Sequence, residues 1–112
     1  MAQVVISESL KQIIFRKFKQ GSIEIFELMK TLESNPKKGK ALGSAGGIVI
    51  KELKYPKFRF YFITDGQRVK FGTEEELTTL LIKFVRLSEK NDQEKMINEI
   101  KNIVSSLGFE AL

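Results

Sequence analysis

The chain has 112 residues, 42% apolar and 29% charged, a composition typical of one soluble globular domain rather than of a disordered chain. It contains neither cysteine nor histidine, which excludes disulfides, thiolate chemistry, a Ser-His-Asp triad and histidine-bound zinc. No apolar run reaches the roughly 18 residues of a membrane helix, and residues 1–8 lack the basic and apolar regions of a signal peptide, so a cytoplasmic location is expected.

The first third of the sequence predicts one strand and two helices. Residues 4–6 form a short apolar strand, and either Ser7 or Ser9 can cap the helix that follows. Gly21 ends this helix, and a second helix follows over residues 22–34, before an Asn-Pro pair. Two short helices joined by a glycine predict an αα-hairpin.

The middle of the sequence predicts a set of strands. Residues 48–55 and 57–64 form two strands on either side of a proline. The turn signal Asp65-Gly66 then leads into a short return strand over residues 67–71. Residues 77–85 form the most apolar strand, which we expect at the centre of the sheet.

The last predicted element is a helix that Asn91 caps, with Glu94 in the capping-box position and Gly108 at its end. Its expected buried stripe consists of Met96, Ile97, Ile100, Ile103, Val104 and Leu107. The element order predicts the α+β class, with an N-terminal αα-hairpin and a C-terminal helix packed on one face of a mostly antiparallel sheet of about four strands. We expect residues 1–112 to form a single domain.

The glycine-rich segment GKALGSAGG, residues 39–47, is interpreted as a flexible connection. A phosphate-binding P-loop has Ser or Thr after its Gly-Lys pair and precedes a helix, whereas Lys40 is followed by alanine and the segment leads into a strand. The carboxylates of residues 74–76 are likewise interpreted as a solvated turn and not as a metal site.

Basic residues are concentrated in one segment of the chain. Between Lys37 and Arg59 there are seven basic residues and one acidic residue, so the charge of this segment is +6. The net charge of the whole chain is +5, so the rest of the chain has a charge of −1. A basic patch on a near-neutral body favours a polyanionic partner, either nucleic acid or an acidic protein. The alternative is that these residues only keep the edges of the sheet soluble.

Two arginines stand out because they lie on or at the end of predicted strands. Three phenylalanines alternate along residues 58–62 and predict the core side of that strand, so Arg59 lies on the opposite face with Lys57 and Tyr61. Arg59 is either an arginine on the solvent face of a half-covered sheet or an anion-binding group on a rigid strand. Arg86 ends the apolar strand, and we expect both arginines to point away from the helices and converge on one phosphate.

Four segments occur in a recognisable order. TLESNPKKGKAL ends the second helix, IKELKYPKFRFYFITDG covers the predicted strand pair, LLIKFVRLSEKND covers the apolar strand, and QEKMINEIKNI begins the last helix. Over nearly the full length these segments resemble the RelE/HigB-type toxin superfamily of toxin–antitoxin systems. Members of that superfamily carry NP…GK.L after a helix, a YELR…YRILYF..DG strand pair, and LLHGFVKKTQKTP.

The resemblance implies a RelE-like toxin domain that acts as a metal-independent endoribonuclease on mRNA, often on the ribosome, and that an antitoxin protein neutralises. It implies no cofactor and no membrane partner. In such a reaction a 2′-hydroxyl attacks the adjacent phosphate while basic groups assist proton removal and stabilise the developing charge. By alignment with the motifs, the catalytic residues are Lys54, Arg59 and Arg86. The predicted RNA-binding residues are Lys37, Lys38, Lys40, Lys51, Lys57, Lys83 and Lys90.

The chain departs from the family pattern in three places. Some members supply a C-terminal tyrosine or histidine to the site, whereas the only tyrosines here are Tyr55 and Tyr61. Leu87 replaces the second lysine of the final basic pair, and Arg68–Glu76 reads as an insertion between strands that are normally joined tightly. Two other functions remain open beside the ribonuclease. One is a non-catalytic module that binds RNA, DNA or a partner protein through the same groove, and the other is a gyrase-inhibiting toxin of the ParE branch.

Overall fold

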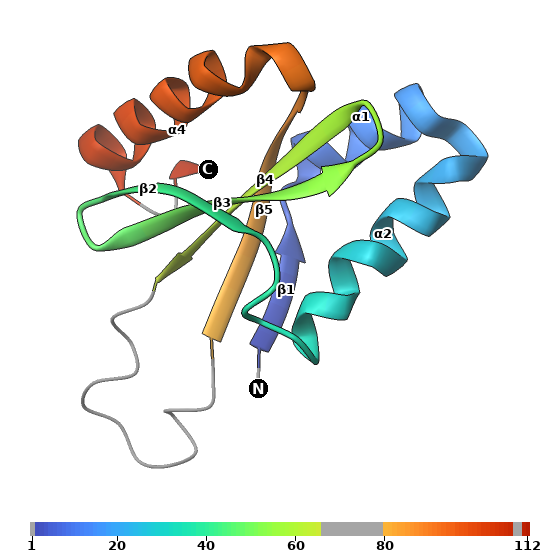
Figure 1. Ribbon diagram of the computed structural model, residues 1–112, viewed down its shortest axis with the longest axis horizontal. Helices are drawn as coiled ribbons and strands as arrows, with labels where there is room; N and C mark the ends of the chain where they lie inside the picture. The colour runs from blue at the N-terminus through green and yellow to red at the C-terminus, as the bar shows by residue number, and fades with distance from the viewer. Residues whose placement is uncertain (1, 66–79, 109–110) are drawn as a thin grey trace.

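The structure is a computed structural model that describes residues 2–65, 80–108 and 111–112. Its five strands form one mixed sheet in the order β1-β5-β4-β3-β2 (Figure 1). The strands are β1 (Ala2–Ile6), β2 (Lys40–Ala45), β3 (Ile48–Tyr55), β4 (Phe58–Asp65) and β5 (Leu80–Glu89). The β1–β5 pair is parallel, and the other three neighbouring pairs are antiparallel. The predicted α+β class is confirmed.

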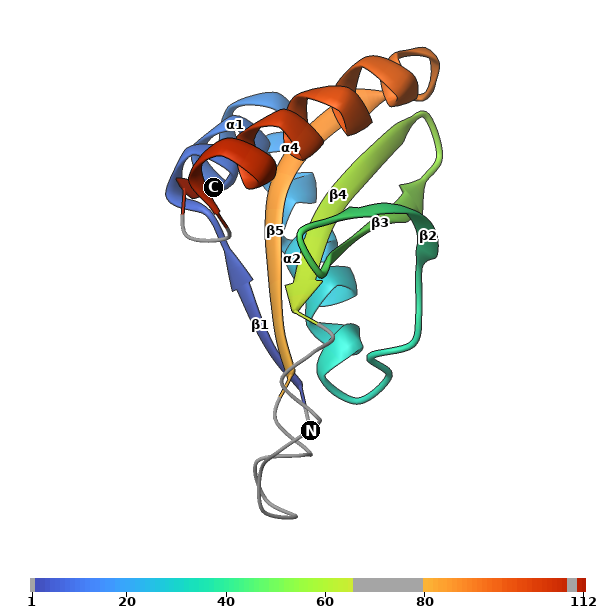
Figure 2. The same cartoon turned by 90° about the vertical axis from the view of Figure 1, so that its left-hand side faces the viewer.

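Helices cover both faces of the sheet. The helices α1 (Glu8–Phe18) and α2 (Ser22–Lys30), joined by the 3₁₀ turn η1 (Lys19–Gly21), pack on one face (Figure 1). The helix α4 (Gln93–Leu107) packs on the other face, as the turned view in Figure 2 shows. No helix in the described parts of the chain is both long and apolar enough to cross a membrane.

The expectation that all helices cover one face is wrong because β4 is apolar on both of its faces. Phe60 and Phe62 belong to the core cluster beneath α1 and α2, whereas Tyr61 and Ile63 belong to the cluster beneath α4. All four side chains are fully buried. A strand with this composition needs cover on both sides, as interior strands of parallel sheets do. The prediction that Phe60 lies in the core is confirmed.

Local sequence signals account for several helix ends. The Ser7 hydroxyl accepts a hydrogen bond from the Leu10 N–H at 3.3 Å and caps α1, as one of the two predicted serines should. α4 ends at Gly108, which has a φ of +88°. The predicted cap at Asn91 is wrong, because the 3₁₀ turn η3 (Lys90–Asp92) takes up that residue and α4 begins at Gln93.

The predicted stripe of α4 is only partly correct. Ile100 and Val104 are buried, but Leu107 is 73% exposed. The apolar residues of α1 also differ in burial, since Leu10 and Ile14 are buried and Phe15 is 51% exposed. Helical periodicity therefore gave the buried face but overestimated its width.

The glycine-rich segment is not a flexible connection, because it contains the edge strand β2 and a tight hairpin. Ala45 pairs with Ile48, so only Gly46 and Gly47 form the loop between β2 and β3. Both glycines have positive φ values, +56° and +81°, which two-residue hairpin turns favour because they match the twist of the strands. The pair Gly46-Gly47 was therefore a hairpin signal.

A bulge in β5 changes the direction of its side chains. Tyr61 lies opposite Arg86, while Phe62 lies opposite Phe84, so Val85 is an extra residue in β5. As a result Val85 and Arg86 lie on the same side of the sheet. β5 is also not the central strand that residues 77–85 were expected to form, because β4 is the middle strand of the five.

Three expectations fall on residues that the structure does not describe. These are the return strand over residues 67–71, the turn at residues 74–76 and the insertion Arg68–Glu76.

Gly39 is required by close packing, and this leads to a testable prediction. A Cβ at Gly39 would lie 2.9 Å from the ring of Phe62 and 3.0 Å from the backbone oxygen of Glu52, and the φ of Gly39 is +103°. We expect Gly39→Ala to lower the free energy of unfolding by about 3 kcal/mol, through strain and overpacking.

Gly46 is the control, because its φ is +56° and a Cβ there meets nothing within 4 Å. Gly46→Ala should cost about 1 kcal/mol. Equal losses in urea denaturation would contradict this reading of Gly39.

Candidate nucleic-acid interface

A basic hollow lies at the turn between β3 and β4. It has a volume of about 300 Å³ and is lined by Lys54, Tyr55, Pro56, Arg59 and Lys90. Lys54 lies directly opposite Arg59 in the β3–β4 register. Lys90 reaches the hollow because its backbone N–H donates to the Lys57 carbonyl at 3.3 Å, which ties η3 to the turn. Lys54 and Lys90 are exposed, so two cations at this hollow are open to solvent.

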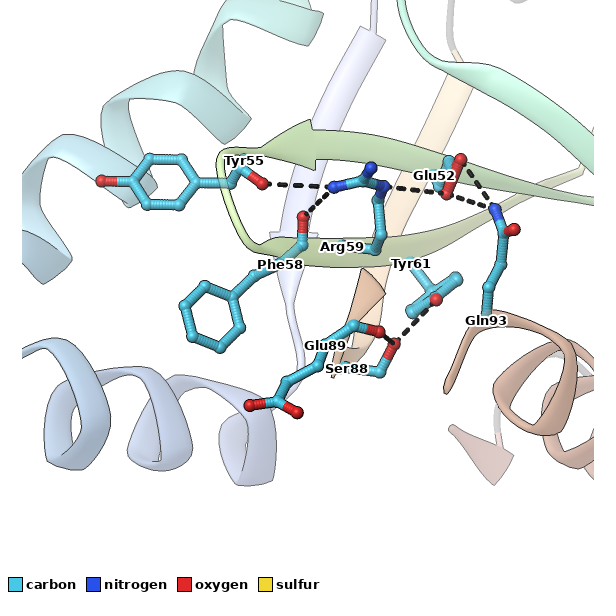
Figure 3. Close-up of polar contacts among 8 residues, drawn as sticks. All are labelled: Glu52, Tyr55, Phe58, Arg59, Tyr61, Ser88, Glu89 and Gln93. Atoms are coloured by element: carbon cyan, nitrogen blue, oxygen red, sulfur yellow. Dashed lines mark hydrogen bonds and ion pairs between the residues drawn. The ribbon is translucent and has the colours of Figure 1, made fainter. Parts of the chain in front are cut away.

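Arg59 is not an open surface cation. It is 6% exposed, and one of its terminal nitrogens donates to the carbonyls of Phe58 at 2.8 Å and Tyr55 at 3.3 Å (Figure 3). Its Nε lies 3.7 Å from Oε2 of Glu52, which is itself 4% exposed. Neither sequence interpretation anticipated this burial. Arg59 still contributes to the hollow wall, but its guanidinium is held in place by the protein.

Glu52 is the functional group that sequence reasoning missed. Its carboxylate accepts hydrogen bonds from the Gln93 amide at 2.8 and 2.6 Å, so it joins β3 and β4 to the first residue of α4 (Figure 3). A signal for the Glu52–Arg59 contact was present. A two-residue turn that pairs Tyr55 with Phe58 also puts Glu52 and Arg59 on one face, on neighbouring strands. Nothing local predicted the contribution of Gln93.

Arg86 lies on the same face of the sheet as Arg59 but does not line the basic hollow. Its Nε lies 3.6 Å from Oε2 of Glu99 on α4, and one terminal nitrogen donates to the Val85 carbonyl at 2.9 Å. Arg59 and Arg86 are on neighbouring strands. The expectation that both arginines point away from the helices is wrong, because they lie on the face that α4 covers, and each guanidinium pairs with a different carboxylate. Their convergence on one phosphate stays a prediction.

A buried tyrosine lies between the two arginines. The Tyr61 hydroxyl and Ser88 Oγ are 2.8 Å apart, and Ser88 Oγ donates to the Glu89 carbonyl at 2.9 Å. Either hydroxyl can donate in the bond between Tyr61 and Ser88. Burial raises the pKa of the Tyr61 phenol, although the bond to Ser88 and the Arg59 cation act in the opposite direction. Burial therefore favours the neutral phenol.

A second, mainly apolar hollow adjoins the first. It has a volume of about 320 Å³ and is lined by Leu28, Lys38, Gly39, Lys40, Glu52, Leu53 and Lys54. Lys54 lines both hollows, so the two adjoin at this residue near the end of β3. We call the second one the apolar hollow, to distinguish it from the basic hollow, and we call the two together the tract.

The other predicted RNA-binding lysines lie in different places. Lys37 and Lys57 are exposed near the tract. Lys51 lies beneath the loop that carries Lys37 and donates to its carbonyl at 3.3 Å, and burial lowers the pKa of the Lys51 ammonium. Lys83 lies opposite Ile63, far along β5 from the hollows. The structure therefore groups most of the predicted cations around the tract and separates Lys83 from them.

Comparisons with protein-family models, with curated proteins and with solved structures found no match to this chain.

Proposed function

We propose that the chain binds single-stranded RNA at the basic hollow and cuts it, as the toxin of a toxin–antitoxin pair of the RelE/HigB type. The observation that carries this proposal is the group of Lys54, Arg59 and Lys90 around one hollow. Two of these cations are exposed and the third is held by three protein groups, so a phosphate entering the hollow meets positive charge already in position.

The element order agrees with the family that the sequence resembles. A strand leads into the helices α1 and α2, the antiparallel strands β2, β3 and β4 follow, and β5 and α4 come after them. The RelE-like arrangement and the antitoxin partner are part of the proposal. We further propose mRNA as the substrate, with the ribosome presenting it.

The proposed reaction needs only acid–base and charge-stabilising groups. The 2′-oxygen of one ribose attacks the adjacent phosphorus, the bond from phosphorus to the 5′-oxygen breaks, and a 2′,3′-cyclic phosphate and a 5′-hydroxyl form. The proton of the 2′-hydroxyl leaves to a base, and the departing 5′-oxygen takes one up. Lys54 is the side chain we assign to proton transfer, because its ammonium lines the hollow and can give a proton to the departing 5′-oxygen, while solvent water takes the proton of the 2′-hydroxyl. Arg59 and Lys90 would stabilise the charge on the phosphate.

A specific observation favours a second candidate, a non-catalytic RNA-binding module. Both arginines that the resemblance assigns to catalysis are paired with carboxylates, Arg59 with Glu52 and Arg86 with Glu99. A module of this kind would use the exposed lysines to hold the RNA backbone and would leave the chain intact.

Charge reversal of the basic hollow tests the binding part of both candidates. The triple variant Lys54→Glu, Lys57→Glu, Lys90→Glu removes three exposed cations from this region. If each contacts one phosphate, the slope of log affinity against log salt should become shallower by about 2 for single-stranded RNA. The measurement is equilibrium binding of a labelled RNA at several salt concentrations.

The control has the same change in net charge elsewhere. Lys19, Lys30 and Lys95 are exposed on the helical surfaces, so their reversal to glutamate should leave the slope within about 0.5 of the wild-type value if they make no phosphate contact. Equal losses in the two triple variants would mean that net charge alone attracts RNA, and the basic hollow would no longer be the proposed site.

A further inference from the structure

The apolar hollow has the form of a site for a small ligand with an apolar body. Leu28 on α2, Leu53 on β3 and the segment around Gly39 line it. Its volume of about 320 Å³ is at the lower end of the roughly 300–1,000 Å³ of small-molecule sites. Lys38, Lys40 and Lys54 line the same hollow. The ligand that suits these walls is therefore compact, apolar on its faces and negatively charged.

The edge of β3 adds a second requirement. β2 pairs with β3 only as far as Lys40 opposite Glu52, so within the described residues no strand neighbours Leu53–Tyr55 on that side. The backbone oxygen of Glu52 points to this edge, because it lies beside Gly39. Backbone groups alternate in direction along a strand, so the N–H and C=O of Lys54 face the same open edge. A ligand here meets one donor and one acceptor beside an apolar wall.

We propose that the apolar hollow holds one nucleobase of the RNA strand whose phosphates lie at the basic hollow. A base has apolar faces that fit between Leu28 and Leu53, and a polar edge that can pair with the backbone of Lys54. Lys54 lines both hollows, so a base in one places its own or the next phosphate at the other. A fatty acid would match the walls and the lysines but would leave the strand edge unused. This inference rests on the proposed function, since it names the part of the RNA that the tract reads.

The test compares RNA with and without a base at each position. A short single-stranded RNA is prepared with one abasic residue at every position in turn, and its affinity is measured against the intact RNA. We expect one abasic position to weaken binding by roughly fivefold to 150-fold, the range for losing one stacked base. Abasic residues that cost the same small amount at every position would overturn the proposal.

A filled hollow provides the matched variant. Leu28→Trp places a larger side chain in the apolar hollow, whereas Ile23→Trp places the same side chain at a residue that is 64% exposed on the same helix. In the first variant the sensitivity to the abasic position should disappear while the salt dependence of binding is retained. The second variant should keep both. Circular dichroism checks that each variant is folded, and retained sensitivity in a folded Leu28→Trp protein contradicts the proposal.

Binding of mononucleotides tests the base site independently of RNA binding, so it distinguishes a failure of this inference from a failure of the proposed function. Uridine and adenosine 5′-monophosphates should shift the backbone amide signal of Lys54 and the methyl signals of Leu28 in nuclear magnetic resonance spectra, and ribose 5-phosphate should not. If the mononucleotides bind there but no RNA is bound at low salt, the RNA function fails and the hollow is a nucleotide site. If hexanoate shifts these signals and the mononucleotides do not, the base assignment is wrong.

Discussion

Replacing Arg59 with alanine is expected to lower the free energy of unfolding by about 3–5 kcal/mol, because it leaves a buried carboxylate without its cation. Glu52 is 4% exposed, and among the described residues the Gln93 amide is the side-chain donor that would remain after the change. Water replaces a lost partner poorly at this depth, so the charge of Glu52 becomes a cost to the folded state. The measurement is urea denaturation followed by circular dichroism.

Two further variants determine whether the pair is responsible. Lys57→Ala removes an exposed cation from the same turn and should change stability by less than about 0.5 kcal/mol. The double variant Arg59→Ala, Glu52→Ala should lose less stability than the two single losses added together, because neither charge is then left alone. An Arg59→Ala protein within about 1 kcal/mol of wild type would show that the pair contributes little.

Replacing Lys54 with alanine is expected to slow RNA cleavage by roughly tenfold to a thousandfold, the range for losing one acid–base or charge-stabilising group. Lys54 is exposed and lines both hollows, so the fold should be retained while the side chain to which we assign proton transfer is lost. RNA affinity should fall much less, because Lys90 and the lysines of the apolar hollow remain. The measurement is the single-turnover rate of fragment formation.

Lys83→Ala is the control for this prediction. Lys83 is a lysine on the same sheet, opposite Ile63, and it lines neither hollow. Its removal should leave the cleavage rate within about twofold of wild type, an expected size for a charge remote from the reacting phosphate. If Lys54→Ala cuts RNA as fast as Lys83→Ala does, proton transfer by Lys54 is excluded.

The sequence predicted the elements whose ends depend on nearby residues. Ser7 caps α1, Gly108 ends α4, and the bounds of β3 are those expected for residues 48–55. These signals act within a few residues and do not depend on the rest of the fold. Edge strand β2 was missed because Gly46-Gly47 was read as flexibility, although two glycines between strands also define a tight hairpin.

The sequence identified basic residues of the candidate site but did not predict which groups surround them. Lys54, Arg59 and Lys90 were all identified as basic site residues, and they do line one hollow. The burial of Arg59 could not be predicted, because it depends on α4 covering that face and bringing Gln93 to Glu52. Position along a strand gives the face of a side chain, but only the packing of distant elements decides whether that face is open.

The direction of the Arg86 side chain also could not be predicted from the sequence, because it depends on the bulge in β5. A strict alternation along β5 would put Val85 and Arg86 on opposite faces, but the extra residue puts both on the side of α4. Arg86 then pairs with Glu99 and lies outside the basic hollow. Bulges depend on pairing with the neighbouring strand, so the residues of β5 alone gave no sign of this one.

The central claim is that this chain cuts RNA at the basic hollow without a metal ion. The most direct measurement is incubation of purified wild-type protein with end-labelled mRNA, in EDTA without ribosomes and in a magnesium buffer with ribosomes, followed by analysis of the fragment ends. Our account predicts fragments that end in a 2′,3′-cyclic phosphate and begin with a 5′-hydroxyl, formed much more slowly by Lys54→Ala. RNA that is bound but remains intact under both conditions would contradict the claim, and the chain would then be the non-catalytic binding module.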